Sequence, residues 1–227
     1  MRKTLDYFTK FEQFLWLISI FTTTISFLIF KQTEYLYLVA SHIGITALIF
    51  LAKGNPIGQL LIIIFSVFYG LISLSYQYYG EMITYIGMTA PIALIALVTW
   101  IKHPYKGHLR EVEISLLSRK TYSFIIFGGL LATLFFYFIL NQLSTPNIVL
   151  SSLSIFTSFT ASILTLKRSK YYAIAYALND LVLIWMWLLA SMHQVSYMSL
   201  VICFIAFFIN DLYGFINWSR IYKKQSV

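Results

Sequence analysis

Eight long apolar stretches, separated by short polar segments, constrain the fold of this 227-residue chain more than any other feature. Each is close to the ~20 apolar residues that a helix needs to cross a hydrocarbon core of ~30 Å. The stretches cover residues 13–30, 34–52, 57–75, 82–101, 121–140, 147–166, 171–190 and 195–217. A composition that is 59% hydrophobic and 11% charged agrees, because it leaves too little polar surface for a globule in water. We therefore predict an all-α integral membrane protein with about eight transmembrane helices.

The basic residues are unevenly distributed between the connecting segments. If the stretches cross the membrane in order, fifteen of the sixteen Lys and Arg residues fall on one side, and only Lys31 falls on the other. Cytoplasmic loops are enriched in Lys and Arg, so we expect a multi-pass protein with both termini in the cytoplasm. The net charge of +8 is spread over short loops without a basic face, and nucleic acid is therefore not an expected partner.

The sequence lacks the motifs of enzymes and of metal sites. It has no His-Glu-x-x-His, no Gly-x-Ser-x-Gly and no phosphate-binding glycine loop. Cys203 is the only cysteine, which rules out an internal disulfide and a thiolate metal cluster. We predict no enzymatic activity and no cofactor, and we expect the partners to be the lipid bilayer and a small-molecule substrate.

The two halves of the chain have similar spacing. Lys53 and Trp100 are 47 residues apart, and Lys170 and Trp218 are 48 apart. Equal spacing with the same cytoplasmic start and finish predicts a parallel repeat of two three-helix bundles joined by a linker helix. The alternative is that Trp recurs at helix ends because it favours membrane interfaces. The predicted parts are an extra N-terminal helix (1–33), a first bundle (34–101), a cytoplasmic loop with the linker helix (102–140), and a second bundle with a basic tail (141–227).

Two Asn-Asp pairs carry the acidic residues that fall inside these predicted spans. They are Asn179-Asp180 and Asn210-Asp211. A carboxylate in hydrocarbon costs several kcal/mol unless it faces protein or water, so intramembrane carboxylates usually mark a pathway or a site. The alternative is that each Asp is a protonated or hydrogen-bonded group in helix packing.

Helical spacing groups further residues with these pairs. The predicted substrate-binding residues are Asn179, Asp180, Asn210, Asp211, Asn217, Trp187, Tyr176, Tyr172 and Trp218. Amide and carboxylate groups hydrogen-bond a hydroxylated ligand, while aromatic faces stack on a ring, more strongly if the ring is cationic. An aromatic stripe that serves only helix packing is the alternative. Pro91 is expected to bend the helix predicted for 82–101.

Several short segments resemble the bacterial PnuC family of vitamin transporters. The similar segments are Lys53-Gly54-Asn55-Pro56-Ile57-Gly58, Tyr78-Tyr79-Gly80-Glu81, Trp100-Ile101-Lys102 and Asn210-Asp211-Leu212-Tyr213-Gly214-Phe215-Ile216-Asn217-Trp218. The resemblance covers about residues 30–222, and the last segment is its most specific part. It implies a SWEET-like arrangement in the bacterial inner membrane and a homotrimer. It also implies uptake of nicotinamide riboside, for NAD biosynthesis, by facilitated diffusion with trapping by phosphorylation in the cytosol.

One departure from the family pattern keeps other substrates open. Many nicotinamide riboside carriers of this family have Trp-x-x-Trp at the start of the penultimate helix, where this chain has Tyr172 and Ala175. The alternatives are a carrier of thiamine, riboflavin or a deoxynucleoside, and a membrane receptor or subunit that transports nothing.

The charge distribution predicts which loops face which side. We expect Gln142→Cys to be labelled by an impermeant maleimide only from outside the cell, and His108→Cys only from inside. Labelling of His108→Cys from the outer face would contradict the loop-charge argument and the repeat that depends on it.

Overall fold

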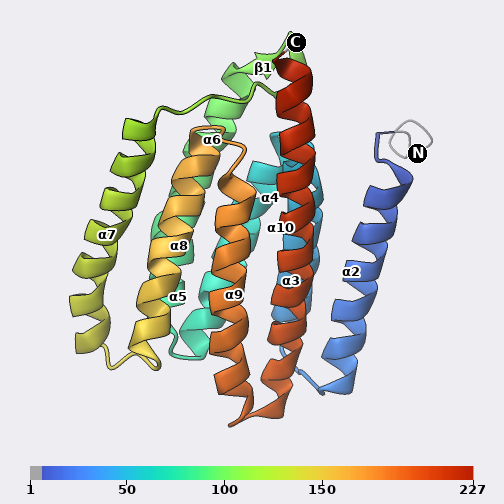
Figure 1. Cartoon of the computed structure of the whole chain (residues 1–227). Coiled ribbons are helices and arrows are strands. Elements are labelled where there is room, and N and C mark those ends of the chain that lie inside the picture. The colour runs from blue at the N-terminus through green and yellow to red at the C-terminus, as the bar shows by residue number, and fades with distance from the viewer. Residues whose placement is uncertain (1–6, 227) are drawn as a thin grey trace.

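The structure is a computed structural model in which residues 7–226 are described; the basic residues Arg2 and Lys3 lie outside the described residues. Figure 1 shows a bundle of long helices with one short hairpin. The elements are α2 (Lys10–Ile29), α3 (Tyr35–Ala52), α4 (Ile57–Ser75), α5 (Tyr79–Met82), the π-helix η1 (Ile83–Thr89), α6 (Ala90–Lys102), β1 (Pro104–Tyr105), β2 (His108–Val112), α7 (Arg119–Gln142), α8 (Ile148–Leu166), α9 (Tyr172–Ser191), η2 (Val195–Tyr197) and α10 (Met198–Gln225).

Eight helical segments of the described chain are long and apolar enough to cross a membrane. Among them, α5, η1 and α6 form one crossing, Tyr79–Lys102, and η2 continues into α10. The prediction of an all-α protein with about eight transmembrane helices is confirmed. A π-helix ends two residues before Pro91, and Pro91 lies in the first turn of α6, where its missing N–H is tolerated. The bend expected at Pro91 stays a prediction.

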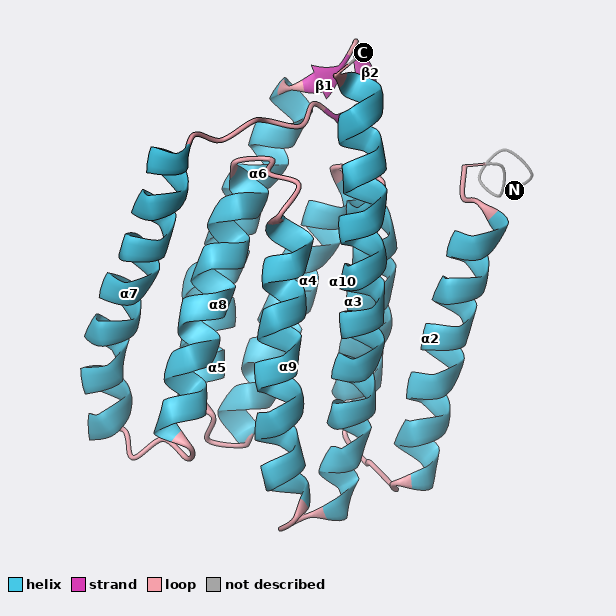
Figure 2. Cartoon of the chain, in the orientation of Figure 1, coloured by secondary structure: helices cyan, strands magenta, loops and turns pink. Residues whose placement is uncertain are grey.

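Both ends of the described chain lie at the same end of the bundle, together with the β1–β2 hairpin (Figures 1 and 2). The Tyr7 hydroxyl donates to the backbone oxygen of Arg110 in β2, and Gln225 at the end of α10 donates to the backbone oxygen of Val112. All the Lys and Arg residues of the described chain except Lys31 belong to this end, which we call the basic end. Lys31 lies in the α2–α3 connection at the opposite end.

The helix α2 is fixed to the bundle by a buried carboxylate. Glu12 forms a capping box with Thr9 and is almost fully buried. It also forms a 3.1 Å ion pair with Lys53 after α3 and accepts a 2.8 Å hydrogen bond from Tyr213 of α10. A carboxylate with this many donors is stable in an apolar environment. Glu12 lies one residue before the stretch predicted from 13, so the sequence analysis did not count it among the acidic residues of the helices.

The ends of α6 and α10 make equivalent contacts across the bundle. Trp100 Nε1 donates to the backbone oxygen of Thr165 at the end of α8, at 3.0 Å. Trp218 Nε1 donates to the backbone oxygen of Leu51 at the end of α3, at 2.8 Å. Both rings are fully buried, and their centroids are 5.4 Å apart. Each indole thus adds a hydrogen bond to a carbonyl in the last turn of a helix, where the regular helical donors end. We call this pair the Trp clasp.

The segment after α6 is more ordered than a simple linker. Beyond the β1–β2 hairpin, Val112 N donates to the backbone oxygen of Gly54, and Ser115 N donates to that of Arg168. Gly54 and Arg168 occupy equivalent positions after α3 and α8, and both have positive φ, 68° and 57°. Residues 112–115 therefore hold the basic ends of the two predicted bundles together.

The buried ion pair of Glu12 predicts a measurable loss of stability. Glu12→Gln removes the charge that pairs with Lys53, which is largely buried, and should cost about 1–3 kcal/mol. Glu111→Gln is the matched control, since its partner Lys224 is mostly exposed, and it should cost at most about 1 kcal/mol. Thermal midpoints in detergent measure both. Equal small shifts would contradict a structural role for Glu12.

Candidate functional site

The two intramembrane aspartates lie side by side. Asp180 on α9 and Asp211 on α10 are almost fully buried, and their carboxyl groups lie next to each other. Two neighbouring carboxyl groups in an apolar interior favour a partner that is positively charged or donates hydrogen bonds. Asp180 Oδ2 has no hydrogen-bond partner among the described residues. The pair can therefore still accept a hydrogen bond or face a cation.

Aromatic residues from both predicted bundles surround the carboxyl pair. Tyr176 on α9 lies within electrostatic range of both aspartates, and its hydroxyl is 3.1 Å from Ser162 Oγ. Tyr85, on η1 of the first predicted bundle, lies within electrostatic range of Asp180. The site is thus at the interface between the bundles, where a relative movement of the two would open or close it.

The asparagines of the two pairs face away from their aspartates. Asn179 Oδ1 accepts hydrogen bonds from α8, from Thr157 at 2.7 Å and from Ser158 at 2.9 Å. Asn210 Nδ2 donates to Ser19 of α2 at 2.9 Å. Neighbouring residues on a helix point ~100° apart, so each pair divides between two interfaces. The remaining amide atoms, Asn179 Nδ2 and Asn210 Oδ1, are buried without partners in the described structure.

The other predicted site residues lie towards the two ends. Asn217 Nδ2 donates to the backbone oxygen of Ala52, next to the Trp clasp. The ring of Tyr172 packs edge-on against Trp218, with centroids 4.7 Å apart. These three predicted residues therefore lie together at the basic end.

Trp187 lies in the opposite half of α9, and its side chain is fully buried. Its Nε1 donates to the hydroxyl of Tyr69 on α4, at 2.9 Å. This hydrogen bond links the two predicted bundles on the side of the carboxyl pair away from the Trp clasp.

The structure adds a carboxyl group that the sequence analysis missed. Glu81 on α5 has an exposed fraction of 0%. It lies next to Ser154, but that hydroxyl donates to Asn179, and neither carboxylate oxygen has a well-formed hydrogen bond among the described residues. The statement that only two acidic residues lie in the spans is therefore wrong. The predicted span begins at 82 and so leaves Glu81 outside, whereas the helix begins at Tyr79.

Buried hydroxyls without partners continue this polar interior. Buried polar groups are nearly always hydrogen-bonded, so a concentration of unpaired ones indicates that water or a ligand satisfies them. In the described structure the unpaired hydroxyls of the first predicted bundle are those of Ser66, Ser73, Thr84 and Thr89. Two of them belong to η1, and π-helices are frequent at functional sites.

Comparison with known proteins identifies the family of this chain. A family model described as nicotinamide mononucleotide transporter matches residues 34–220. The chain belongs to this family. It is 22% identical over 222 residues to a curated protein named nicotinamide riboside transporter PnuC, from Neisseria mucosa, and the match covers 96% of this chain and 84% of that protein.

The fold is also similar to a solved one. A crystal structure described as that of the vitamin B3 transporter PnuC superposes with a TM-score of 0.83 at 22% identity, covering 96% of this chain and 94% of the other. Together with the eight helices, these matches identify a multi-pass membrane transporter and not an enzyme. The resemblance to the PnuC family is confirmed.

Proposed function

We propose that this transporter carries nicotinamide riboside into the bacterial cytoplasm by facilitated diffusion, with trapping by phosphorylation inside the cell. The observation that carries the proposal is the carboxyl pair of Asp180 and Asp211, buried between the bundles with one oxygen free. Nicotinamide riboside combines a pyridinium cation with a ribose. A carboxyl pair beside tyrosine rings suits the cation, and the unpaired hydroxyls suit the ribose.

We further propose that the nine predicted site residues contribute at different stages of transport. Asp180, Asp211 and Tyr176 lie at the middle of the bundle and would contact the bound substrate. Asn179 and Asn210 each keep one unpaired amide atom, with which they can reach the same cavity after a small rotation of their helices. Tyr172, Asn217 and Trp218 would meet the substrate only as it leaves at the basic end, and Trp187 as it enters from the other.

Alternating access would be a rocking of one bundle against the other. The equivalent contacts of the Trp clasp support the parallel repeat, because the third helix of each predicted bundle ends against the first helix of the other. The positive-inside rule assigns the basic end, with both termini, to the cytoplasm. Opening to the cytoplasm would then separate Trp100 from Trp218 and release residues 112–115. The family resemblance also supports a homotrimer.

Passive transport predicts simple equilibration in vesicles. α9 contains no Lys, Arg or His, and the first such residue of α10 is Arg220, nine residues after Asp211, so neither helix supplies a proton relay for its aspartate. In vesicles without a kinase, internal nicotinamide riboside should therefore rise only to the external concentration. With a nicotinamide riboside kinase and ATP inside, phosphorylated product should accumulate.

Two results would contradict this mechanism. An imposed proton or sodium gradient that lifted the internal concentration above the external one would make an aspartate a coupling site. Failure to accumulate any product would favour a receptor or subunit without transport.

A related substrate is the second candidate, because Tyr172 and Ala175 replace the Trp-x-x-Trp of many nicotinamide riboside carriers. Thermal stabilisation of the purified protein separates the candidates. Nicotinamide riboside should raise the midpoint, and thiamine, riboflavin and deoxynucleosides should raise it less. Stabilisation by one of these other compounds alone would identify that compound as the substrate and would leave the assignment as a transporter unchanged.

The carboxyl pair predicts a loss of binding without a loss of folding. Asp180→Asn and Asp211→Asn keep size and hydrogen bonding but remove the charge that faces the cation. Each should raise the Kd for nicotinamide riboside by about 10-fold or more, which is about 1.4 kcal/mol. The midpoint without ligand should change little, as it should for the double variant. Unchanged affinity with normal expression would assign both residues to structure.

A further inference from the structure

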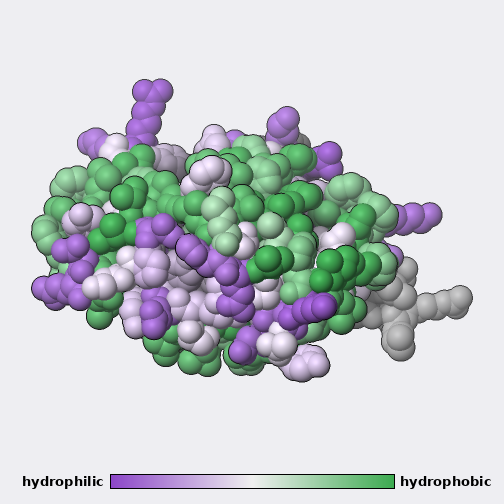
Figure 3. Space-filling view, turned by 90° about the horizontal axis from the view of Figure 1, so that it is seen from below, coloured by the Kyte–Doolittle hydropathy of each residue, from purple (hydrophilic) through white to green (hydrophobic). Residues whose placement is uncertain are grey.

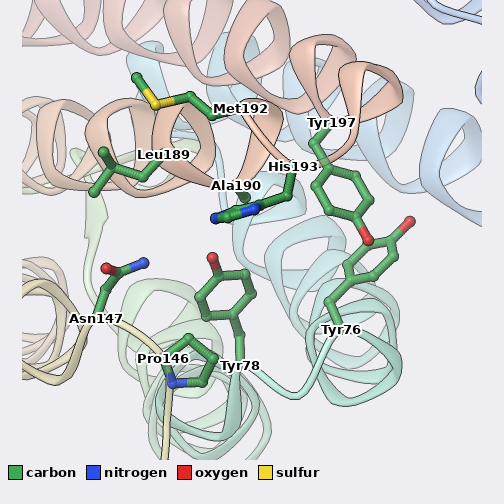
Figure 4. A pocket seen from close by; sticks show the side chains of 9 residues that line it. All are labelled: Tyr76, Tyr78, Pro146, Asn147, Leu189, Ala190, Met192, His193 and Tyr197. Carbon is green, nitrogen blue, oxygen red and sulfur yellow. The ribbon is translucent and has the colours of Figure 1, made fainter.

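A pocket of about 480 Å³ opens at the end opposite the basic end. Its walls come from the α4–α5, α7–α8 and α9–α10 connections, so both predicted bundles contribute (Figure 4). Figure 3, which views the molecule from this end, shows hydrophilic residues gathered between hydrophobic ones. The volume lies within the range of about 300–1,000 Å³ that is usual for small-molecule sites.

Aromatic rings form one side of this outer pocket, and the buried ring of Trp187 lies behind them. Tyr76 and Tyr197 lie against each other, with ring centroids 4.7 Å apart. Both rings pack against the buried ring of Trp187, with centroid separations of 5.6 and 5.8 Å. The ring of Tyr78 does so with a centroid separation of 5.0 Å. Tyr69, the hydrogen-bond partner of Trp187, lies 4.5 Å from the ring of Tyr85 beside Asp180. A continuous series of rings therefore leads from the outer pocket towards the carboxyl pair.

Polar groups converge on the opposite side. The side chains of His193, Asn147 and Tyr78 meet across the pocket in Figure 4, and the Tyr78 hydroxyl is hydrogen-bonded to Asn147. Asn147 has a φ of 52°, a left-handed conformation that asparagine tolerates better than most residues. These groups supply donors and acceptors next to the rings, as a ligand with both an aromatic and a hydroxylated part requires.

The charges near the outer pocket favour a cation. The pocket lining contains no Lys or Arg. Glu34 lies within electrostatic range of Tyr76, and the buried Glu81 lies within range of Tyr78. The negative field of Glu34 and the tyrosine faces both attract a cationic ring.

We propose that this outer pocket is a second binding site, distinct from the carboxyl pair, for a cationic aromatic ring attached to a hydroxylated ring. Ala190 in its wall is ten residues from Asp180 along α9, which is ~15 Å. A ring held here therefore does not touch the carboxyl pair. The substrate stacks on Tyr76 and Tyr197 first and passes to the centre when Trp187, which lies behind these rings, moves aside. The identity of the ligand rests on the proposed function.

Protection of an introduced cysteine tests the site. Met192 lines the pocket with an exposed fraction of 79%, whereas the native Cys203 is buried, so the wild-type protein serves as the unlabelled blank. Met192→Cys should be labelled by an impermeant maleimide, and nicotinamide riboside should slow the labelling at least 5-fold at saturation. Gln142→Cys is the matched control at the same end outside the pocket, and its labelling should not change.

Two further sets of variants separate the outer pocket from the centre. In Met192→Cys combined with Asp180→Asn and Asp211→Asn, the half-protecting concentration should change less than 3-fold. Loss of protection in that variant would overturn the proposal, because protection would then depend on the centre. Tyr197→Leu should raise the half-protecting concentration about 10-fold, whereas Tyr197→Phe, which keeps the ring, should leave it nearly unchanged. Equal effects of the two would also overturn the proposal.

The outcomes distinguish this inference from the proposed function. No protection in Met192→Cys, with normal equilibration of nicotinamide riboside in vesicles, would refute the outer pocket alone. Protection without equilibration would support the outer pocket and refute transport of this substrate. The absence of both protection and equilibration would refute the outer pocket and the proposed function together.

Discussion

The low polarity of a membrane interior makes every buried carboxyl group depend on a nearby donor, and the carboxyl groups of this protein differ in how far they have one. Glu12 is fully paired, with an ion pair to Lys53, a hydrogen bond from Tyr213 and its own capping box. Asp180 and Asp211 have mainly each other, and Glu81 has no well-formed partner in the described structure. Buried carboxyl groups with hydrogen-bond partners stabilise a fold, whereas buried carboxyl groups without them are available to bind a ligand or water. The same chemistry therefore serves structure at α2 and, in the proposed function, substrate binding between the predicted bundles.

The two ends of the bundle differ in the kind of contact that holds them together. At the basic end, indole N–H groups of the Trp clasp pair with carbonyls of α3 and α8, and residues 112–115 add backbone hydrogen bonds to Gly54 and Arg168. At the other end, the rings of Tyr76 and Tyr197 border an open pocket. A carrier that alternates needs one closed and one accessible end at a time. The basic end is held by hydrogen bonds to helix termini, which require a specific geometry. The end with the outer pocket is held by contacts between aromatic rings, which allow the rings to slide past each other.

Hydrophobicity and charge are enough to predict the eight helices, because a bilayer imposes both length and loop composition. The family is predicted from the resemblance of four short segments. Hydrophobicity and charge could not predict which neighbour a polar residue faces. Asn179 and Asp180 are adjacent in sequence, yet one faces α8 and the other α10. Glu81 was also missed, because the apolar stretch in the sequence begins only at residue 82, whereas the helix begins at Tyr79. The hairpin after α6 was missed because its strands are held mainly by contacts with α10 and Gly54, which are distant in sequence.

The contacts of Tyr172 show what the departure from the family pattern changes at this position. The tyrosine ring packs on Trp218 at the basic end and lies within electrostatic range of Asp211. An aromatic ring is therefore kept where many relatives have tryptophan, although its polar group is now a hydroxyl. Ala175, the second altered position, is a small buried residue one turn further along α9. Both altered positions therefore concern helix packing near the basic end. The carboxyl pair, which would meet the charge of the substrate in the proposed function, lies further from that end on α9 and α10 and is not altered.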